Sequence, residues 1–500
     1  MNELKINQQV IPTNWNKREI LRNKGQFWTP DWVTMPMVEY VTKDSDLIFD
    51  PATETGAFLQ AMLLLNKTCK YYGTDIDENV LKSIIYNNPV ATVEKKDFIK
   101  NPPNRKFDAI IANPPYIRHH RIDEQTKELL RQLTTKIIGS TIDGRAGYHI
   151  YFLLQALNLL TKNGRLAFIM PADTCEGVFS KKLWNWIGKN YLLESVITFS
   201  ENAAPFPEID TNAIIFLIKN QKPINKLLWI KVNEVGNELL QFIQSDFTNT
   251  DLPTIDIIER ELSEALQTGL SRPPHQELIS PYKLSDFATV MRGIATGAND
   301  FFFLTNQQIE ELNLPKEYFR LTLGRTRDVE NDILTTKEII ELDRKGRPTM
   351  LLYIDKPKNN LPKQLMDYIK EGEKLELNKR ALIKSRNPWY KTEKREIPEM
   401  LFAYLGRRDV RFIKNEVGVL PLHCLHCVYT NSKDKQEINN LWTVLNHPET
   451  LENLKYVSKS YGSGALKAEP QSLKDLPVPE KFVKKYNLTI RKKLIYNTLF

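Results

Sequence analysis

Three short stretches in the first half of the chain combine the residue types that bind a nucleoside. Asp50 opens a glycine-containing loop over residues 50–56, where the backbone can approach a ligand closely. Asp75 ends an apolar run, and a carboxylate at such a strand end can accept hydrogen bonds from both hydroxyls of a ribose. Asp97 and Phe98 add a third carboxylate and a ring, which suit the amine and the ring of adenine. A phosphate cradle is the weaker interpretation, because the first loop carries acid and lacks the lysine of a phosphate-binding loop.

A fourth stretch, Asn113-Pro114-Pro115-Tyr116, follows the apolar run 107–112. The two prolines fix the backbone and remove N–H donors, which leaves the carbonyls free to accept hydrogen bonds. Asn113 adds a side-chain acceptor and Tyr116 adds an aromatic face. The stretch therefore predicts a grip on the exocyclic amine of a planar group, with an ordinary strand-ending turn as the alternative.

Alternating apolar runs and helical spacings indicate the elements that position these residues. We expect an α/β fold, a doubly wound Rossmann-like sheet with helices on both faces, because strands and helices alternate along the first half. Ligands of such sheets bind at the carboxyl ends of the strands. The expected strands are 47–49, 71–74, 107–112, 165–170, 192–199 and 213–219, and the expected helices are 58–65, 80–85 and 148–160.

Composition excludes several classes of protein. Hydrophobic residues make up 41% and charged residues 26% of the chain, as in ordinary globular proteins. Four cysteines are too few for a disulfide framework, and no apolar run reaches the ~18 residues of a membrane span. We expect no secretion signal. A zinc site at Cys424 and Cys427 is not expected, because a strand over 419–429 would place the two thiols on opposite faces.

The charge distribution divides the chain. Residues 316–500 hold 36 lysine and arginine side chains against 24 aspartate and glutamate side chains, whereas the whole chain carries only +8. Such a basic part favours a polyanionic partner, which usually means nucleic acid. The strand–helix alternation also stops near residue 240. We therefore expect a catalytic domain over 1–240, a linker over 241–275 and a mixed α+β domain over 276–500.

The order and spacing of these motifs resemble those of S-adenosylmethionine-dependent DNA N6-adenine methyltransferases. The resemblance is to the gamma-type restriction–modification enzymes, in which the cofactor motifs come first and a target-recognition domain comes last. Residues 25–30, 293–299 and 461–470 resemble further motifs of this class. The resemblance implies S-adenosylmethionine as cofactor, double-stranded DNA as partner and a prokaryotic cytoplasmic setting. It also leaves room for a cognate restriction endonuclease acting on the same site.

The resemblance implies a cofactor role for nine residues. They are Thr29 for the methionine carboxylate, Asp50, Pro51, Ala52 and Gly56 for the methionine moiety, Asp75 for the ribose with Ile76 against the adenine, and Asp97 and Phe98 for the adenine amine and ring. One departure concerns Glu54, which stands where many relatives have glycine. A positive φ would strain this residue, and its charge could oppose the cofactor's carboxylate.

The resemblance also implies how the target base is held. Asn113 and the Pro114 carbonyl would bind the target amine, Tyr116 would stack on the base, and Phe206 would lie opposite. The base must leave the duplex to reach them. His149 lies within the expected helix 148–160 and is interpreted as a packing residue rather than an acid–base catalyst.

DNA contacts are expected from two basic clusters. Arg118 and Arg121 follow Tyr116 directly, and Arg407 and Arg408 lie in the basic second half. Each cluster could contact phosphates or simply be solvated. Three alternatives to DNA methylation remain open on the sequence: a protein glutamine methyltransferase, an RNA base methyltransferase, and a non-catalytic DNA-binding relative.

Overall fold

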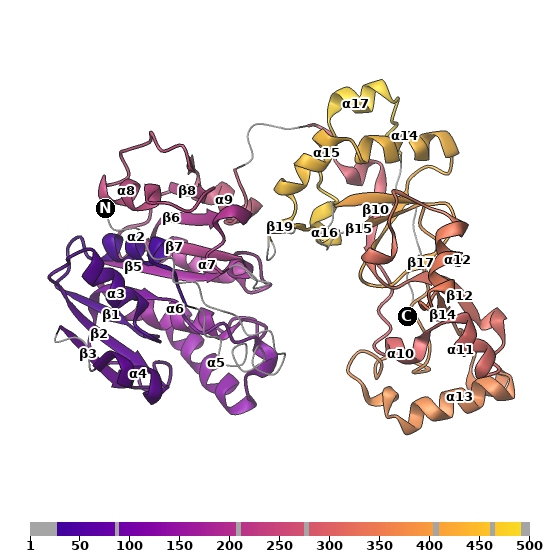
Figure 1. The fold of residues 1–500 in the computed structure, drawn as a ribbon, viewed down its shortest axis with the longest axis horizontal. Helices are drawn as coiled ribbons and strands as arrows, with labels where there is room; N and C mark the ends of the chain where they lie inside the picture. Colours follow the sequence, from indigo (N-terminus) through magenta and orange to yellow (C-terminus); the bar gives the residue numbers. More distant parts are fainter. Residues whose placement is uncertain are drawn as a thin grey trace. The chain divides into compact units, whose positions relative to one another are not determined.

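The chain divides into two compact units in the structure, a computed structural model (Figure 1). The structure describes residues 28–85, 90–206, 212–274, 280–403, 410–460 and 466–491. The first unit runs to Pro274 and also takes in the short strand β19 (Lys459–Ser460). The second unit contains the rest of the chain beyond Pro274.

A nine-stranded sheet forms the centre of the first unit, in the order β3-β2-β1-β4-β5-β7-β6-β8-β9. The strands from β3 to β5 in this order are parallel, and β7 is antiparallel to both of its neighbours. The bounds are β1 Leu47–Asp50, β2 Lys70–Asp75, β3 Ala91–Lys95, β4 Phe107–Ala112, β5 Leu160–Pro171, β6 Leu192–Phe199, β7 Ala213–Lys219, β8 Leu227–Val232 and β9 Ile255–Arg260.

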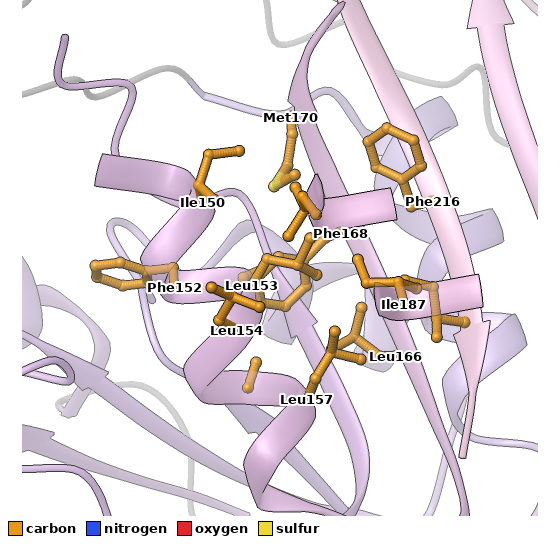
Figure 2. Packing of buried hydrophobic residues seen from close by; sticks show 14 of the residues in the cluster. Ile150, Phe152, Leu153, Leu154, Leu157, Leu166, Phe168, Met170, Ile187 and Phe216 are labelled. Atoms are coloured by element: carbon orange, nitrogen blue, oxygen red, sulfur yellow. The ribbon is translucent and has the colours of Figure 1, made fainter. Parts of the chain in front are cut away.

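Helices cover both faces of this sheet because its central strands are apolar on both sides. Leu166, Phe168 and Met170 of β5 face α6 and α7, as Figure 2 shows for the packing around Phe168. Ala167 and Ile169 belong to the opposite cluster, which includes residues of α2, α3 and α8. The helices of the unit are α2 Asp31–Val41, α3 Ala57–Leu64, α4 Glu78–Ile85, α5 Glu124–Ile138, α6 Tyr148–Leu159, α7 Ser180–Asn190, α8 Glu238–Gln244 and α9 Leu262–Thr268.

The second unit is a mixed α+β structure with two sheets. A five-stranded sheet has the order β10-β18-β15-β16-β13, and a four-stranded sheet has the order β11-β14-β12-β17. Their strands are β10 Ala288–Arg292, β11 Phe303–Leu304, β12 Phe319–Leu323, β13 Ile333–Leu334, β14 Met350–Leu352, β15 Met400–Ala403, β16 Arg411–Asn415, β17 Leu420–Pro421 and β18 His426–Thr430; β20 is Leu466–Lys467. The helices are α10 Asn299–Phe302, α11 Asn306–Glu311, α12 Thr336–Arg344, α13 Lys363–Lys374, α14 Lys435–Leu445, α15 Pro448–Glu452, α16 Pro470–Leu473 and α17 Glu480–Lys485.

The doubly wound sheet and the mixed second unit agree with the expected fold class. The boundary between the units differs from the expectation. Residues 241–275 were expected to be a linker, but β9 (Ile255–Arg260) pairs with β8 in the large sheet. Arg260 is buried and α9 (Leu262–Thr268) packs on α7, which explains why this charged segment belongs to the first unit.

Candidate active site

The strand order of the first unit reverses between β1 and β4. In open α/β sheets, ligands bind outside the carboxyl ends of the strands at such a reversal. The loop after β1 begins at Pro51, the residues after β2 begin at Ile76, and Asn113 follows β4. The motifs that the sequence separates by more than 60 residues therefore meet at one edge of the sheet.

A cavity of about 270 Å³ opens at this edge. It is lined by residues that follow β1, β2, β3 and β4 and by two aromatic residues of α6. Six of the nine residues with an implied cofactor role line it, whereas Thr29, Asp50 and Gly56 do not. The lining residues are Pro51, Ala52, Glu54, Asp75, Ile76, Asp77, Lys96, Asp97, Phe98, Pro115, Ile117, Tyr148 and Phe152.

Backbone amides fix the carboxylate of Asp75 at the wall of the cavity. The Glu54 N–H donates to Oδ2 over 3.0 Å and the Asp77 N–H donates to Oδ1 over 2.9 Å. These bonds orient the carboxylate, and each oxygen keeps a lone pair for a further donor. Asp75 can thus accept two hydrogen bonds from neighbouring hydroxyls, as a ribose would offer.

The loop after β1 is held in a strained conformation. Glu54 has a φ of 47° and Gly56 a φ of 83°, so two residues of the loop occupy the left-handed region. Glycine adopts this region freely, but glutamate does so at a cost of order 1–3 kcal/mol. The strain foreseen for Glu54 is therefore present, and this residue forms part of the cavity wall.

Asp50 lies behind the loop rather than in the cavity. Its side chain is fully buried; Oδ2 accepts a hydrogen bond from the Tyr71 hydroxyl over 2.5 Å and Oδ1 accepts one from the Ala52 N–H over 3.0 Å. Burial raises the pKa of Asp50 to about 7. In this structure Asp50 shapes the loop, which differs from the direct contact with the methionine moiety that the resemblance implied.

The adenine-end residues are also tied into the fold. The Ile99 and Lys100 N–H groups donate to Asp97 Oδ1 over 3.0 and 3.1 Å. Phe98 packs against Phe49 and Phe152, with ring centroids 5.7 and 5.2 Å away. Phe98 is almost completely buried, so it supports the cavity wall.

The side chain of Asn113 lies at the boundary between the cavity region and helix α2. Its Nδ2 donates a hydrogen bond to Thr29 Oγ1 over 3.1 Å, and both residues are buried. Pro114 is buried as well, and Pro115 lines the cavity. The Asn-Pro-Pro-Tyr turn therefore forms part of the wall beside which a cofactor would lie.

Tyr116 is fixed by a hydrogen bond from its hydroxyl to the Ile169 carbonyl of β5 over 3.2 Å. Burial raises its pKa well above the usual value, with further contributions from the carboxylates of Glu54 and Asp173. The His149 ring lies edge-on, 5.9 Å from the Tyr116 ring. Phe206 is buried in the same hydrophobic cluster against which Tyr116 packs.

Sequence profiles of one enzyme family match both units. The profile of the Eco57I restriction-modification methylases matches residues 52–206, and that of the C-terminal domain of Type II methyltransferase M.Eco57I matches residues 276–498. The chain belongs to the Eco57I family of restriction–modification methylases. The first match spans the cavity and the Asn-Pro-Pro-Tyr turn, and the second spans nearly the whole second unit.

Individual relatives agree with this assignment. Type II methyltransferase M.AccI of Acinetobacter calcoaceticus is 26% identical over 465 residues, which cover 90% of this chain and 84% of the relative. M.XamI of Xanthomonas campestris pv. amaranthicola is 22% identical, with coverage of 91% and 85%. The solved structure of the Type IIL restriction-modification enzyme MmeI in complex with DNA aligns with a TM-score of 0.53 and 12% identity over 92% of this chain and 64% of that chain. This likeness shows a shared fold.

The cofactor of this methylase family, S-adenosylmethionine, fits the residues of the cavity. Asp75 offers fixed acceptors for two hydroxyls, and Ile76 and Phe98 offer apolar walls for a purine ring. Asp97 lies at the same wall as Phe98 and can accept from an amine. Thr29 is not among the lining residues of the cavity, and its hydroxyl oxygen accepts the hydrogen bond from Asn113.

Only two of the four arginines expected to bind DNA belong to the described residues. Arg118 and Arg121 are exposed beside the short 3-10 helix His119–Arg121. Arg407 and Arg408 lie outside the described residues. Arg411, another arginine of the basic region, forms an ion pair with Asp332 over 3.0 Å and donates to the Val329 carbonyl over 2.8 Å, so it stabilises the fold of the second unit.

Two further sequence expectations concern Cys424 and His149. Among the described residues, no cluster of three or more histidine, cysteine, aspartate or glutamate side chains could hold a metal ion. His149 is buried in α6 as expected, and neither ring nitrogen makes a hydrogen bond to a described residue.

Within the described ranges, no helix is both long and apolar enough to cross a membrane.

Sequence reasoning missed the wall that α6 contributes to the cavity. Tyr148 and Phe152 line it, and they are spaced by four residues, which places them on one face of the helix. That spacing was readable from the sequence. Which face of α6 would meet the cavity was not readable, because it depends on how the helix packs on β4 and β5.

Proposed function

We propose that the chain transfers the methyl group of S-adenosylmethionine to N6 of adenine in double-stranded DNA, as the modification enzyme of a restriction–modification system. The observation that carries this proposal is the position of the Asn-Pro-Pro-Tyr turn. Pro115 lines the cofactor cavity while Asn113 and Tyr116 flank it in sequence. An amine held by this turn would lie next to the methyl donor.

The chain's own residues would act mainly by orientation. Bound S-adenosylmethionine supplies an electrophilic methyl group, so the amine needs no covalent enzyme intermediate. The Asn113 amide oxygen and the Pro114 carbonyl would accept the two amine hydrogens and favour a more tetrahedral nitrogen. The nitrogen would then bond to the methyl carbon as the carbon–sulfur bond breaks, which leaves S-adenosylhomocysteine, and the extra proton on the methylated amine would pass to solvent water. Alignment of the reacting atoms is itself a large source of rate enhancement.

The aromatic residues would hold the base outside the duplex. An adenine amine is out of reach inside double-stranded DNA, so the base must be flipped into the site. Tyr116 is suited to stack on it, because the hydrogen bond to Ile169 fixes its ring. Phe206 supports the same hydrophobic cluster.

The second unit would select the DNA sequence. The catalytic motifs are complete within the first unit, and the positive excess of the chain lies in residues 316–500. Arg325 and Arg327 are exposed around the 3-10 helix Thr326–Asp328. Arginine is the side chain best suited to bidentate contacts with guanine. A restriction endonuclease acting on the same site is the expected partner.

Nucleoside analysis tests the proposal. The purified chain is incubated with S-adenosylmethionine and unmethylated genomic DNA, and the DNA is digested and examined by mass spectrometry. The expected product is N6-methyl-2′-deoxyadenosine, with no product from the Asn113→Ala variant even though this variant binds cofactor. Methylated cytosine in place of methylated adenine, or DNA left unmodified by the cofactor-binding parent, would contradict the proposal.

A further inference from the structure

The wall of the cofactor cavity is strongly acidic. Glu54, Asp75, Asp77 and Asp97 contribute four carboxylates, and Lys96 contributes one ammonium group. An excess of negative charge in a concave site favours a cation. S-adenosylmethionine carries two positive groups, the sulfonium and the α-ammonium, against one carboxylate.

The cavity carboxylates differ in where they lie. Asp75 ends β2 and Asp77 follows it, and the Asp75 oxygens are oriented by backbone amides in a way that suits ribose hydroxyls. Glu54 belongs to the loop after β1, and its charge contributes to the raised pKa of Tyr116 after the larger effect of burial. Glu54 is therefore within electrostatic range of the residue that would stack on the target base.

The reaction itself fixes which end of the cofactor faces Tyr116. The transferred methyl group has to lie between the cofactor and the amine held by the Asn-Pro-Pro-Tyr turn. The methionine end, which carries the methyl, must consequently face the turn, while the nucleoside end faces Asp75 and Asp97. Glu54 lines this cavity, and of the four cavity carboxylates it is the one whose charge reaches Tyr116.

We propose that the Glu54 carboxylate binds the positive charge at the methionine end of S-adenosylmethionine. This inference rests on the proposed methyl transfer and assigns a role to the residue that departs from the glycine of many relatives. A φ of 47° at Glu54 adds support, because strained backbone of this kind persists where the surrounding structure and the function require it. Repulsion of the cofactor's own carboxylate is the competing possibility, and it predicts the opposite effect of neutralisation.

Calorimetry on the full-length Glu54→Gln variant separates these possibilities. Glutamine keeps the size of the side chain and its positive φ but removes the charge. We expect S-adenosylmethionine to bind about tenfold more weakly, as for the loss of a charge-assisted contact. A loss shared with S-adenosylhomocysteine assigns the contact to the α-ammonium, and a loss confined to S-adenosylmethionine assigns it to the sulfonium. Unchanged or tighter binding of S-adenosylmethionine would overturn the proposal.

Glu78→Gln is the matched control. Glu78 lies at the start of α4, outside the cavity lining, and pairs with Lys82 and Lys95 at the surface. Its neutralisation should change cofactor affinity less than twofold; an equal loss in both variants would mean that only the overall charge matters and would contradict a local contact. If the parent chain itself does not bind S-adenosylmethionine, the proposed function fails rather than this inference alone. Thermal unfolding of both variants verifies that they are folded.

Discussion

Asn113 Nδ2 donates a hydrogen bond to Thr29 Oγ1 over 3.1 Å, and both side chains are buried. With the amide nitrogen bonded to the threonine, the amide oxygen of Asn113 points to the other side. Thr29 precedes α2 (Asp31–Val41) and is 84 residues away in sequence. The segment before α2 thus orients the residue expected to bind the target amine.

Thr29→Val should lower kcat about tenfold, because valine has nearly the same shape but cannot accept the hydrogen bond from Asn113. The Kd for S-adenosylmethionine should change less than threefold, and Thr29→Ser should restore most of the rate. Single-turnover methylation and calorimetry measure the two quantities. A large loss of cofactor affinity with an unchanged kcat would instead indicate that Thr29 binds the methionine carboxylate.

Asp75 and Asp50 should respond differently to the same change. Asp75→Asn replaces one of two oriented oxygens at the cavity wall and should weaken S-adenosylmethionine binding by tenfold or more. Asp50 is not among the lining residues of the cavity, and asparagine at this position can still bond Ala52 and Tyr71. Asp50→Asn should therefore weaken S-adenosylmethionine binding less than threefold. Calorimetry on both variants measures this contrast. Equal losses would show that Asp50 contacts the cofactor.

The pH dependence of stability should include a contribution from His149. Burial lowers its pKa from 6.5 to about 4 in the folded chain. Between these values the unfolded chain binds a proton that the folded chain does not, so stability falls as the pH falls from 6.5 towards 4. The shift corresponds to about 3 kcal/mol.

Chemical denaturation at several pH values measures this contribution. The His149→Leu variant should lose about 3 kcal/mol less than the parent between pH 7 and pH 4. His426 is buried in the second unit, and burial lowers its pKa to about 4. It should therefore contribute a further loss of stability at low pH, equally in both proteins. Parallel pH profiles of parent and variant would mean that His149 is protonated in the folded chain.

The strands near the site could be predicted because their residues are apolar and β-branched. The runs 107–112, 192–199 and 213–219 coincide with β4, β6 and β7. The strand β3 (Ala91–Lys95) was not predicted, because it is a short edge strand in which only Ala91 and Val93 are apolar. Edge strands need little burial on either face, so periodicity cannot find them.

The details of the site depended on contacts that no motif encodes. The resemblance implies direct cofactor roles for Asp50 and Thr29, and it did not indicate the hydrogen bonds that the structure adds, from Tyr71 to Asp50 and from Asn113 to Thr29. Residues 241–275 were expected to be a linker because no strand–helix alternation was recognised beyond residue 240. In the structure β9 of this segment pairs with β8, and Arg260 at the end of β9 forms an ion pair with Glu264 over 2.7 Å.

Arginines at the surface of the second unit should govern DNA binding. Replacing exposed Arg325 and Arg327 together by alanine should weaken binding to specific DNA by tenfold or more and leave cofactor affinity unchanged. If both contact phosphates, the salt dependence should also become shallower by about two counterions. Fluorescence anisotropy at several salt concentrations measures both effects.

Arg344→Ala serves as the control for these arginines. Its side chain is exposed at the end of α12 and pairs with Glu341 over 3.2 Å. We expect less than a twofold change in DNA affinity. A double variant of Arg325 and Arg327 that binds DNA like this control would move the recognition surface elsewhere in the second unit.

Methylome sequencing tests the central claim most directly. The chain and its Asn113→Ala variant are expressed in a host that lacks DNA methylation, and modified bases are mapped across the genome. The account predicts N6-methyladenine at nearly every copy of one short sequence for the parent and at none for the variant. An unmethylated genome with the folded, cofactor-binding parent present, or methylation that persists in the variant, would contradict it.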